Sequence, residues 1–409
     1  MKRRYKITAG LLLCFAGLAA QAQRLSLDSV LNRVAANPAL KAYDAKASAQ
    51  DAYATGAKSL DAPKISAGQY QVPYQLSPSG GSFMIQAEQM FTNPAKLRAK
   101  EEYMKGQSKV TTKDRDYLKN QLVSQAKQYY YERVVLEKKL ALLQHTQDLL
   151  EYMLKDANIR LTYGKEKLPN IYKAKAELFE LDNTREQLNN EISQKNIMLN
   201  TLMNRDKQAA FLVDTNYVLK AYETALTDTA TLATNRSDIK GINRNIDLQQ
   251  LNAQMEYNKR KPDFGVQAGH MFSYGGMANQ YILMASVTIP IVPWASKEYK
   301  ANLKGIQYEV QELQQKRLDM LNQATGQLTG LKTEMSSKKR QLSNYQQNII
   351  PALQNSYKTA LLAYDQNTGD LPSVLNGIKD LQMARMAALD RLQELLLIQV
   401  AYDKENEQY

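Results

Sequence analysis

Few side chains in this sequence could carry out enzymatic or metal chemistry. The 409 residues include two histidines, His145 and His270, and one cysteine, Cys14, all far apart in the chain. A metal centre usually needs about three or four such ligands at close spacing. The signature patterns of zinc proteases, P-loop enzymes and α/β-hydrolases are also absent from the sequence. We therefore predict that the protein is not an enzyme and has no catalytic residue, resident metal or cofactor.

Methionine is the only abundant residue type with a soft sulfur ligand, with 15 copies. Its thioether suits soft metal ions. Four methionines recur at helical spacing: Met198, Met203, Met383 and Met386. The same spacing is typical of a helical core, in which methionine is a common filler. We favour the packing interpretation for these four residues.

The first 22 residues have the pattern of a secretory signal peptide. A basic stretch that ends at Lys6 is followed by an apolar stretch from Ile7 to Ala20 and by the cleavage pattern Ala20-Gln21-Ala22. The apolar stretch is too short to cross a membrane as a helix. We expect cleavage after Ala22, which leaves a mature chain without cysteine.

The formal net charge of +12 does not indicate a nucleic acid partner. Lysine and arginine alternate with aspartate and glutamate, which is typical of the solvated faces of helices. The cluster Lys338-Lys339-Arg340 is isolated and lacks the aromatic residues that stack on bases. We expect no nucleic acid binding.

Long helices dominate the predicted structure. Glycine (18 residues) and proline (11 residues) are too scarce for a fold with many turns, and the mean hydropathy of −0.50 excludes a bundle of membrane helices. Residues 96–160 contain no proline, and they form a rod of roughly 100 Å if they are helical throughout. Their apolar residues follow a heptad pattern: Leu118, Leu122, Tyr129, Leu136, Leu140, Leu143, Leu150 and Leu154. A second long helix, residues 296–363, should bend or break at Pro351.

The sequence also indicates an internal duplication. Matching positions recur at one constant separation: Ala39 with Asp238, Pro63 with Pro262, and Pro94 with Pro293. Each copy predicts an opening helix (27–60 and 238–260), two strands, a very long helix, a turn with Leu-Pro and a further helix. We divide the chain into a signal peptide (1–22), a first repeat (23–205), a connecting segment (206–234) and a second repeat (235–409).

Four segments alternate apolar and polar residues as strands do: Lys64–Pro73, Ser82–Thr92, Asp263–Tyr274 and Gln280–Ile291. Each is near the length of about 9–11 residues that a tilted membrane strand needs. Four strands cannot close a barrel, so either several chains share one membrane barrel or the segments form soluble hairpins against the helices. The strand pattern alone slightly favours soluble hairpins, but the signal peptide, the duplication and the rod-length helices favour the shared barrel.

The order of these elements resembles the outer-membrane factor family, whose type member is TolC. The opening helix carries Asn37-Pro38-Ala39-Leu40, similar to the family's N-P-x-L pattern. Each strand pair ends in an apolar stretch and a proline, Pro94 or Pro293, before the long helix. A helix–turn–helix similar to the family's Y-x-x-G-x-x-x-x-x-D-V-L pattern follows at residues 163–171 and again at 364–375. The matches occur twice, in order, across nearly the whole mature chain.

The resemblance implies a mainly α protein with a small β part. Long antiparallel coiled-coil helices would form an α-barrel, and four strands per chain would contribute to a twelve-strand outer-membrane β-barrel shared by a homotrimer. The protein would be the exit duct of a tripartite efflux or type I secretion system, through which small molecules or ions pass passively. Its partners would be outer-membrane lipid, a periplasmic adaptor and an inner-membrane pump, and its helices would extend into the periplasm.

The family pattern assigns the two turns between long helices to the adaptor contact. The matching residues are Tyr163, Gly164, Leu168, Tyr364, Gly369 and Leu371. The alternative is that they only terminate helices, because tight turns demand glycine in any case.

The family often has aspartates that ring the periplasmic aperture. The aligned positions hold Asn170, Ser373 and Asn376 instead, so a cation-binding ring is not carried over to this chain. Asp365 and Asp370 are the nearest substitutes. The alternative function is a secreted or periplasmic coiled-coil scaffold or adhesin without a pore, which would be soluble and would not conduct ions.

Overall fold

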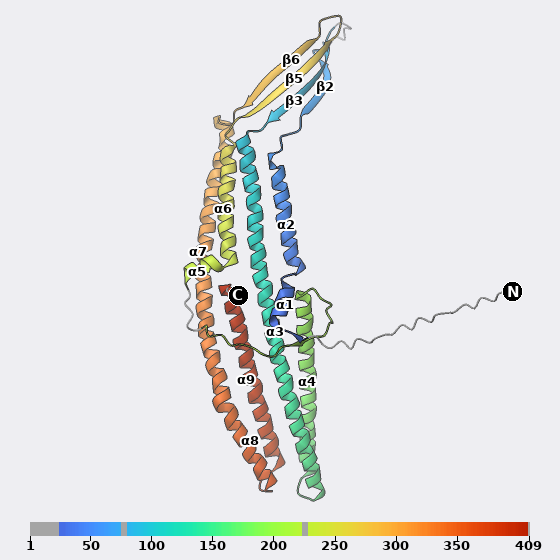
Figure 1. Ribbon diagram of the computed structural model, residues 1–409, viewed down its shortest axis with the longest axis vertical. Coiled ribbons are helices and arrows are strands. Elements are labelled where there is room, and N and C mark those ends of the chain that lie inside the picture. The colour runs from blue at the N-terminus through green and yellow to red at the C-terminus, as the bar shows by residue number, and fades with distance from the viewer. Residues whose placement is uncertain (1–23, 75–79, 223–227, 408–409) are drawn as a thin grey trace, which may run out of the picture.

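The computed structural model describes residues 24–74, 80–222 and 228–407. The predicted signal peptide lies outside these ranges. The molecule is elongated, with a β-sheet at one end and two helical turns at the other (Figure 1). In the described part of the chain, no helix is both long enough and apolar enough to cross a bilayer.

The elements of the first half alternate between helices and short strands. They are β1 (Arg24–Leu25), α1 (Leu27–Val34), α2 (Pro38–Thr55), a 3₁₀ turn (Gly56–Lys58), β2 (Lys64–Tyr70), β3 (Ser82–Phe91), α3 (Pro94–Thr162), α4 (Leu168–Leu202) and β4 (Leu212–Val213). The second half follows a similar order. Its elements are α5 (Thr229–Asn235), α6 (Ser237–Asn258), β5 (Asp263–Ser273), β6 (Gln280–Thr288), α7 (Pro293–Asn344), a π turn (Tyr345–Ile349), α8 (Ile350–Asp365) and α9 (Leu371–Asn406).

The opening helix is divided, so the prediction of one helix over residues 27–60 is wrong. Asn37 caps α2 because its Oδ1 accepts a hydrogen bond from the Ala39 amide at 2.9 Å. Pro38 occupies the first turn of α2, where its missing N–H costs nothing. The Asn37 side chain also donates to the Leu202 carbonyl at 2.8 Å, which fixes the break against the end of α4.

Helix α3 confirms the predicted rod, since its 69 residues span about 100 Å. Leu136, Leu143 and Leu150 are buried, as the heptad pattern requires. From Glu132 to Leu136 every residue is buried, which that pattern does not predict. Here α3 is enclosed, because α1 and β4 pack on it together with α9.

The second long helix is interrupted close to Pro351, as predicted. Helix α7 ends at Asn344, and a π turn of five residues leads into α8. Pro351 lies in the first turn of α8, so the irregular turn before it accommodates the lost hydrogen bond.

The packing prediction for the four helical methionines is half right. Met203 is buried and Met386 packs against the core between the lower helices. Met198 and Met383 are exposed in the chain, at 38% and 53% of their surface.

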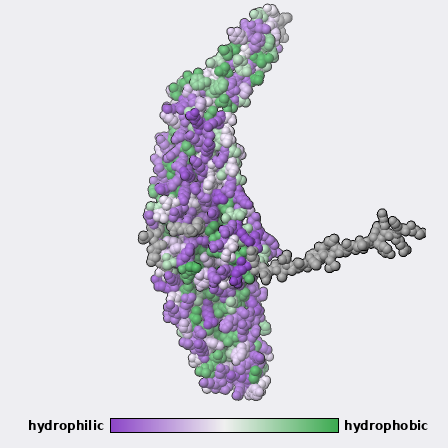
Figure 2. Space-filling model, in the orientation of Figure 1, coloured by the Kyte–Doolittle hydropathy of each residue, from purple (hydrophilic) through white to green (hydrophobic). Residues whose placement is uncertain are grey.

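The sheet has the antiparallel order β2-β3-β5-β6, and the central β3–β5 pair joins the two halves of the chain. The register sorts its residues onto two faces. One face carries the exposed apolar residues Ile65, Ile85, Phe91, Phe264, Val266, Phe272, Tyr281, Leu283 and Val287. The other face carries Lys64, Ser66, Gln86, Glu88, Gln267, Ser286 and Thr288. Figure 2 shows hydrophobic surface over the sheet and mostly hydrophilic surface on the adjoining helices.

Candidate functional site at the helical hairpin tips

Two helical turns lie together at the end of the molecule remote from the sheet (Figure 1). One joins α3 to α4 and the other joins α8 to α9. A single hydrophobic core holds the four helices, with Leu150, Ile171, Leu371 and Ile378 among its buried residues. The two hairpins therefore pack against each other immediately above their turns.

Arg160, in the last turn of α3, connects the two hairpins. Its Nε donates to Asp156 one helical turn away at 2.7 Å. Its other nitrogens reach across to the second turn, where they donate to the Tyr364 carbonyl at 3.0 Å, to Asn367 Oδ1 at 3.2 Å and to Asp365 Oδ1 at 3.3 Å. The guanidinium also lies 4.2 Å from the centre of the Tyr364 ring, a cation–π contact.

Arg160 stays protonated in its partly buried position. Burial disfavours the charged guanidinium, but the hydrogen bond and charge of Asp156 outweigh it, so the pKa of Arg160 is raised. Arg160 is therefore a permanent cation between the two turns.

A second connection runs through Tyr364 and Glu166. The Tyr364 hydroxyl donates to Glu166 Oε2 at 3.2 Å. The other oxygen of Glu166 accepts from the Lys167 amide at 2.7 Å and from Asn170 Nδ2 at 2.8 Å. Burial, with the Glu166 charge, raises the pKa of the Tyr364 hydroxyl. Tyr364 therefore keeps the proton that it donates to Glu166 at any pH below the ordinary tyrosine pKa of about 10. This hydrogen bond is lost only as the pH rises through the raised pKa of Tyr364.

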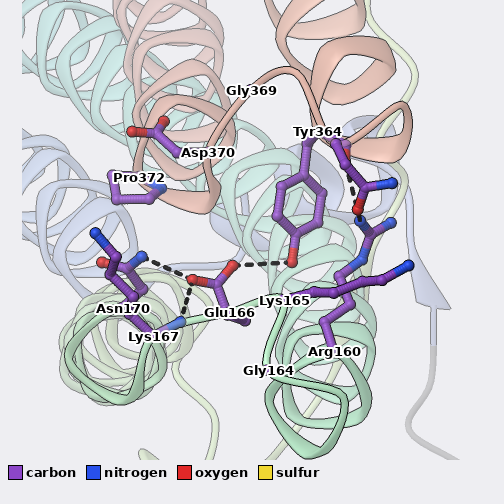
Figure 3. Close-up of a pocket in the computed structure, with 11 residues that line it drawn as sticks. Arg160, Gly164, Lys165, Glu166, Lys167, Asn170, Tyr364, Gly369, Asp370 and Pro372 are labelled. Atoms are coloured by element: carbon purple, nitrogen blue, oxygen red, sulfur yellow. Dashed lines mark hydrogen bonds between the residues drawn. The ribbon is translucent and has the colours of Figure 1, made fainter.

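A cavity of about 340 Å³ lies between the two turns. Figure 3 shows Glu166 at its centre, between Tyr364 and Asn170, with Asp370 and Pro372 on the facing turn. Lys165 and Lys167 also line it and are exposed. The cavity thus combines exposed cations with an internal network of hydrogen bonds. We call that network, formed by Asp156, Arg160, Glu166, Tyr364, Asp365 and Asn367, the tip network.

The predicted tip residues fall into two groups. Tyr163 and Leu168 are exposed, at 76% and 48% of their surface, while Tyr364 and Leu371 are buried, at 3% and 0%. Tyr364 and Leu371 are enclosed between the two hairpins in this structure. Their contact with an adaptor stays a prediction. Gly164 has a φ of +70° and forms the first turn.

The predicted aperture residues lie at the starts of α4 and α9. Asn170 is engaged with Glu166, and Ser373 and Asn376 are exposed. Of the substitute carboxylates, Asp370 caps α9, where the hydroxyl and amide of Ser373 lower its pKa. Asp365 pairs with Arg160. Among the described residues, no three histidine, cysteine, aspartate or glutamate side chains are grouped to hold a metal ion.

Sequence reasoning missed Arg160, Asp156 and Glu166. The only local signal is the spacing of Asp156 and Arg160, which places an ion pair on one helix face just before a turn.

Several solved structures with a similar arrangement are outer-membrane proteins. The VceC outer membrane protein of Vibrio cholerae superimposes with a TM-score of 0.73 at 14% identity, over 93% of this chain and 95% of VceC. The CmeC outer membrane channel of Campylobacter jejuni gives 0.71 at 15% identity, over 93% and 85% of the two chains. The open state of the MtrE outer membrane channel of Neisseria gonorrhoeae gives 0.70 at 14% identity, over 93% and 88%.

The chain has the TolC-like outer-membrane channel fold. The predicted fold class is therefore confirmed. No protein-family model and no curated protein matches the sequence. The channel fold is thus established from the arrangement of elements rather than from sequence identity.

Gly369 lies in a crowded position in the second turn of this channel fold. A Cβ at Gly369 would lie 3.0 Å from Ala363 Cβ and 3.1 Å from the Tyr364 nitrogen. We expect Gly369→Ala to loosen the α8–α9 turn by about 1–2 kcal/mol, because the backbone must shift to admit the methyl group. Limited proteolysis of the purified protein should then cut within residues 366–370 faster than in the wild type.

Gly326→Ala is the matched control. Gly326 lies within α7, and apart from its chain neighbours and the adjacent backbone of α7 no atom lies within 4 Å of a Cβ placed there. Alanine at this position should be neutral or slightly stabilising. Equal cleavage rates for the two variants and the wild type would show that crowding at Gly369 does not matter.

Proposed function

We propose that this protein is the outer-membrane exit duct of a tripartite efflux or type I secretion system and that it works as a homotrimer. The observation that carries the proposal is the apolar face of the sheet. Its exposed residues form a band that a single soluble chain would not leave bare.

The apolar face has the layout of a membrane strand surface. Aromatic residues lie near both ends of the band, with Phe272 and Tyr281 at the loop end and Phe91 and Phe264 at the helix end. Between them lie aliphatic residues such as Leu283. Membrane barrels carry such aromatic girdles around an apolar belt about 25 Å tall. Trp294, which is 79% exposed, follows at the helix end and fits the same girdle.

The open edges of the sheet support assembly. β2 and β6 each have one neighbour, so their outer edges are unpaired. Lipid does not satisfy such edges, and only closure of the barrel does. Three copies, joined β6 to β2, supply twelve strands, which is enough for a closed barrel.

The tips support docking to a periplasmic adaptor, which in turn engages an inner-membrane pump. Tyr163 and Leu168 offer apolar surface next to the exposed cations Lys165 and Lys167. The tip network holds the two hairpins of one chain together. A partner that separates them would widen the aperture, so the duct itself needs no chemistry and no energy source.

Planar bilayer recordings test the pore. We expect the purified protein to fractionate with the outer membrane, to run as a trimer after cross-linking and to give discrete conductance steps. A soluble monomer without conductance would favour the scaffold or adhesin and overturn the proposal.

A further inference from the structure

Every methionine of the described strands lies on the polar face of the sheet. Met84 and Met90 belong to β3, Met271 to β5 and Met284 to β6. The register places them on the same face as Glu88 and Gln267 and opposite the apolar band. If these side chains served only as apolar filler, we would expect some of them on the apolar face. Their common side calls for another explanation.

Two of these residues form a direct pair. Met84 and Met271 are cross-strand partners, so their Cβ atoms are about 4.5–5.5 Å apart. Each side chain has three flexible bonds beyond the backbone, and both sulfur atoms can reach one ion between them. Met271 is 7% exposed and Met84 is half-buried, so the pair is largely shielded from water.

The surroundings of the pair suit a cation. Its neighbours in the same row are Gly68 on β2 and Gln280 on β6. Neither carries a positive charge, and no atom lies within 4 Å of a Cβ placed at Gly68. The space beside Met84 is therefore open, and an arriving cation meets no repelling group in this row.

The other two methionines lie farther along the same face. A Cβ at Gly265 would lie 2.5 Å from Met90 Sδ, so the thioether of Met90 rests directly on that glycine. Met284 lies beside Gln267 in the row of Glu88 and is 47% exposed. At about 3.4 Å per residue, Met284 is about 14 Å from the Met84–Met271 row along the strands, and Met90 is about 7 Å beyond it. Thioethers thus recur from the loop end of the face to its helix end.

We propose that the Met84–Met271 pair is a binding site for a soft monovalent metal ion, Cu(I) or Ag(I), on the inner face of the barrel. Thioethers are soft, neutral ligands that select such ions over Na⁺, Mg²⁺ or Ca²⁺. The proposal rests on the proposed function, because this face lines a pore only in a closed barrel. The ion enters and leaves without a change of oxidation state, and the substrates of the duct then include soft metal ions.

Silver nitrate in chloride-free buffer is the probe, because Ag(I) does not oxidise in air. Equilibrium dialysis of the full-length trimer in lipid nanodiscs, followed by elemental analysis, gives the amount bound per chain. The double variant Met84→Leu/Met271→Leu keeps the side-chain volume and should bind Ag(I) at least about tenfold more weakly than the wild type. The control Met198→Leu/Met383→Leu removes two exposed helical thioethers and should bind as the wild type does.

Equal Ag(I) binding by wild type and Met84→Leu/Met271→Leu would overturn the site, and so would the absence of binding to the wild type. Potassium conductance of the same preparations separates this result from the proposed function. If the protein conducts but does not bind Ag(I), the pore proposal stands and the metal site is rejected. If the protein binds Ag(I) through the pair but never conducts, the metal site stands and the pore proposal is rejected.

Discussion

Replacing Arg160 with alanine is expected to open the tip of the duct while leaving the helices folded. Arg160 is the residue of α3 that reaches Tyr364, Asp365 and Asn367 of the other hairpin. Its side chain is only 17% exposed, so its partly buried contacts count for more than those of a surface ion pair. We expect the variant to lose about 2 kcal/mol of cross-hairpin interaction, which raises the population of separated hairpins about 30-fold.

Spin labels placed on the two turns would report this separation as a longer distance between the labels. Bilayer recordings would report it as a higher single-channel conductance. Arg185→Ala is the matched control, because Arg185 bonds to Gln147 and Asp182 within the α3–α4 hairpin alone. If Arg160→Ala and Arg185→Ala show the same label distances and the same conductance, the tip network does not hold the aperture closed.

The elements that the sequence could predict are those whose signals are local. The heptad pattern of α3 and the alternation of the four strands depend on neighbours a few residues apart, and both led to the correct element. The break at Asn37-Pro38 also had a local signal, a capping residue followed by proline. The prediction of one helix over residues 27–60 missed this break because the helical spacing of apolar residues continues across it.

The site depends on contacts that no local pattern contains. Arg160 and Tyr364 are 204 residues apart in the chain, and they meet only because the two hairpins pack side by side. Leu371 illustrates the same limit, since a leucine in a turn has the same local sequence whether it is exposed or, as here, fully buried. The Met84–Met271 pair depends on the β3–β5 register, which joins the two halves of the chain. The alternation predicted which residues share a face of each strand, but not which residues stand opposite one another.

Because the two faces of the sheet differ in polarity, the same substitution at two neighbouring residues of β5 should have very different effects on assembly. Ala268 lies in the middle of the apolar face, between Ala87 and Leu283, whereas Gln267 points to the opposite face. An arginine that faces lipid near the bilayer midplane costs about 2–4 kcal/mol. Because a trimer carries the substitution three times, we expect Ala268→Arg to abolish stable trimers in the outer membrane.

Gln267→Arg adds the same side chain one residue away, on the face that we propose lines the pore. It loses the hydrogen bond from Gln267 Nε2 to Gln86 Oε1, which is 2.7 Å long, but its charge meets water and Glu88 rather than lipid. We expect normal trimers whose ion selectivity shifts toward anions, since lumen substitutions tune selectivity.

Semi-native electrophoresis of outer-membrane fractions measures the trimer, and reversal potentials in a salt gradient measure the selectivity. If both variants assemble equally well, the apolar face does not contact lipid. The sheet would then belong to a soluble scaffold, because the difference between the two substitutions exists only where one face meets hydrocarbon and the other meets water.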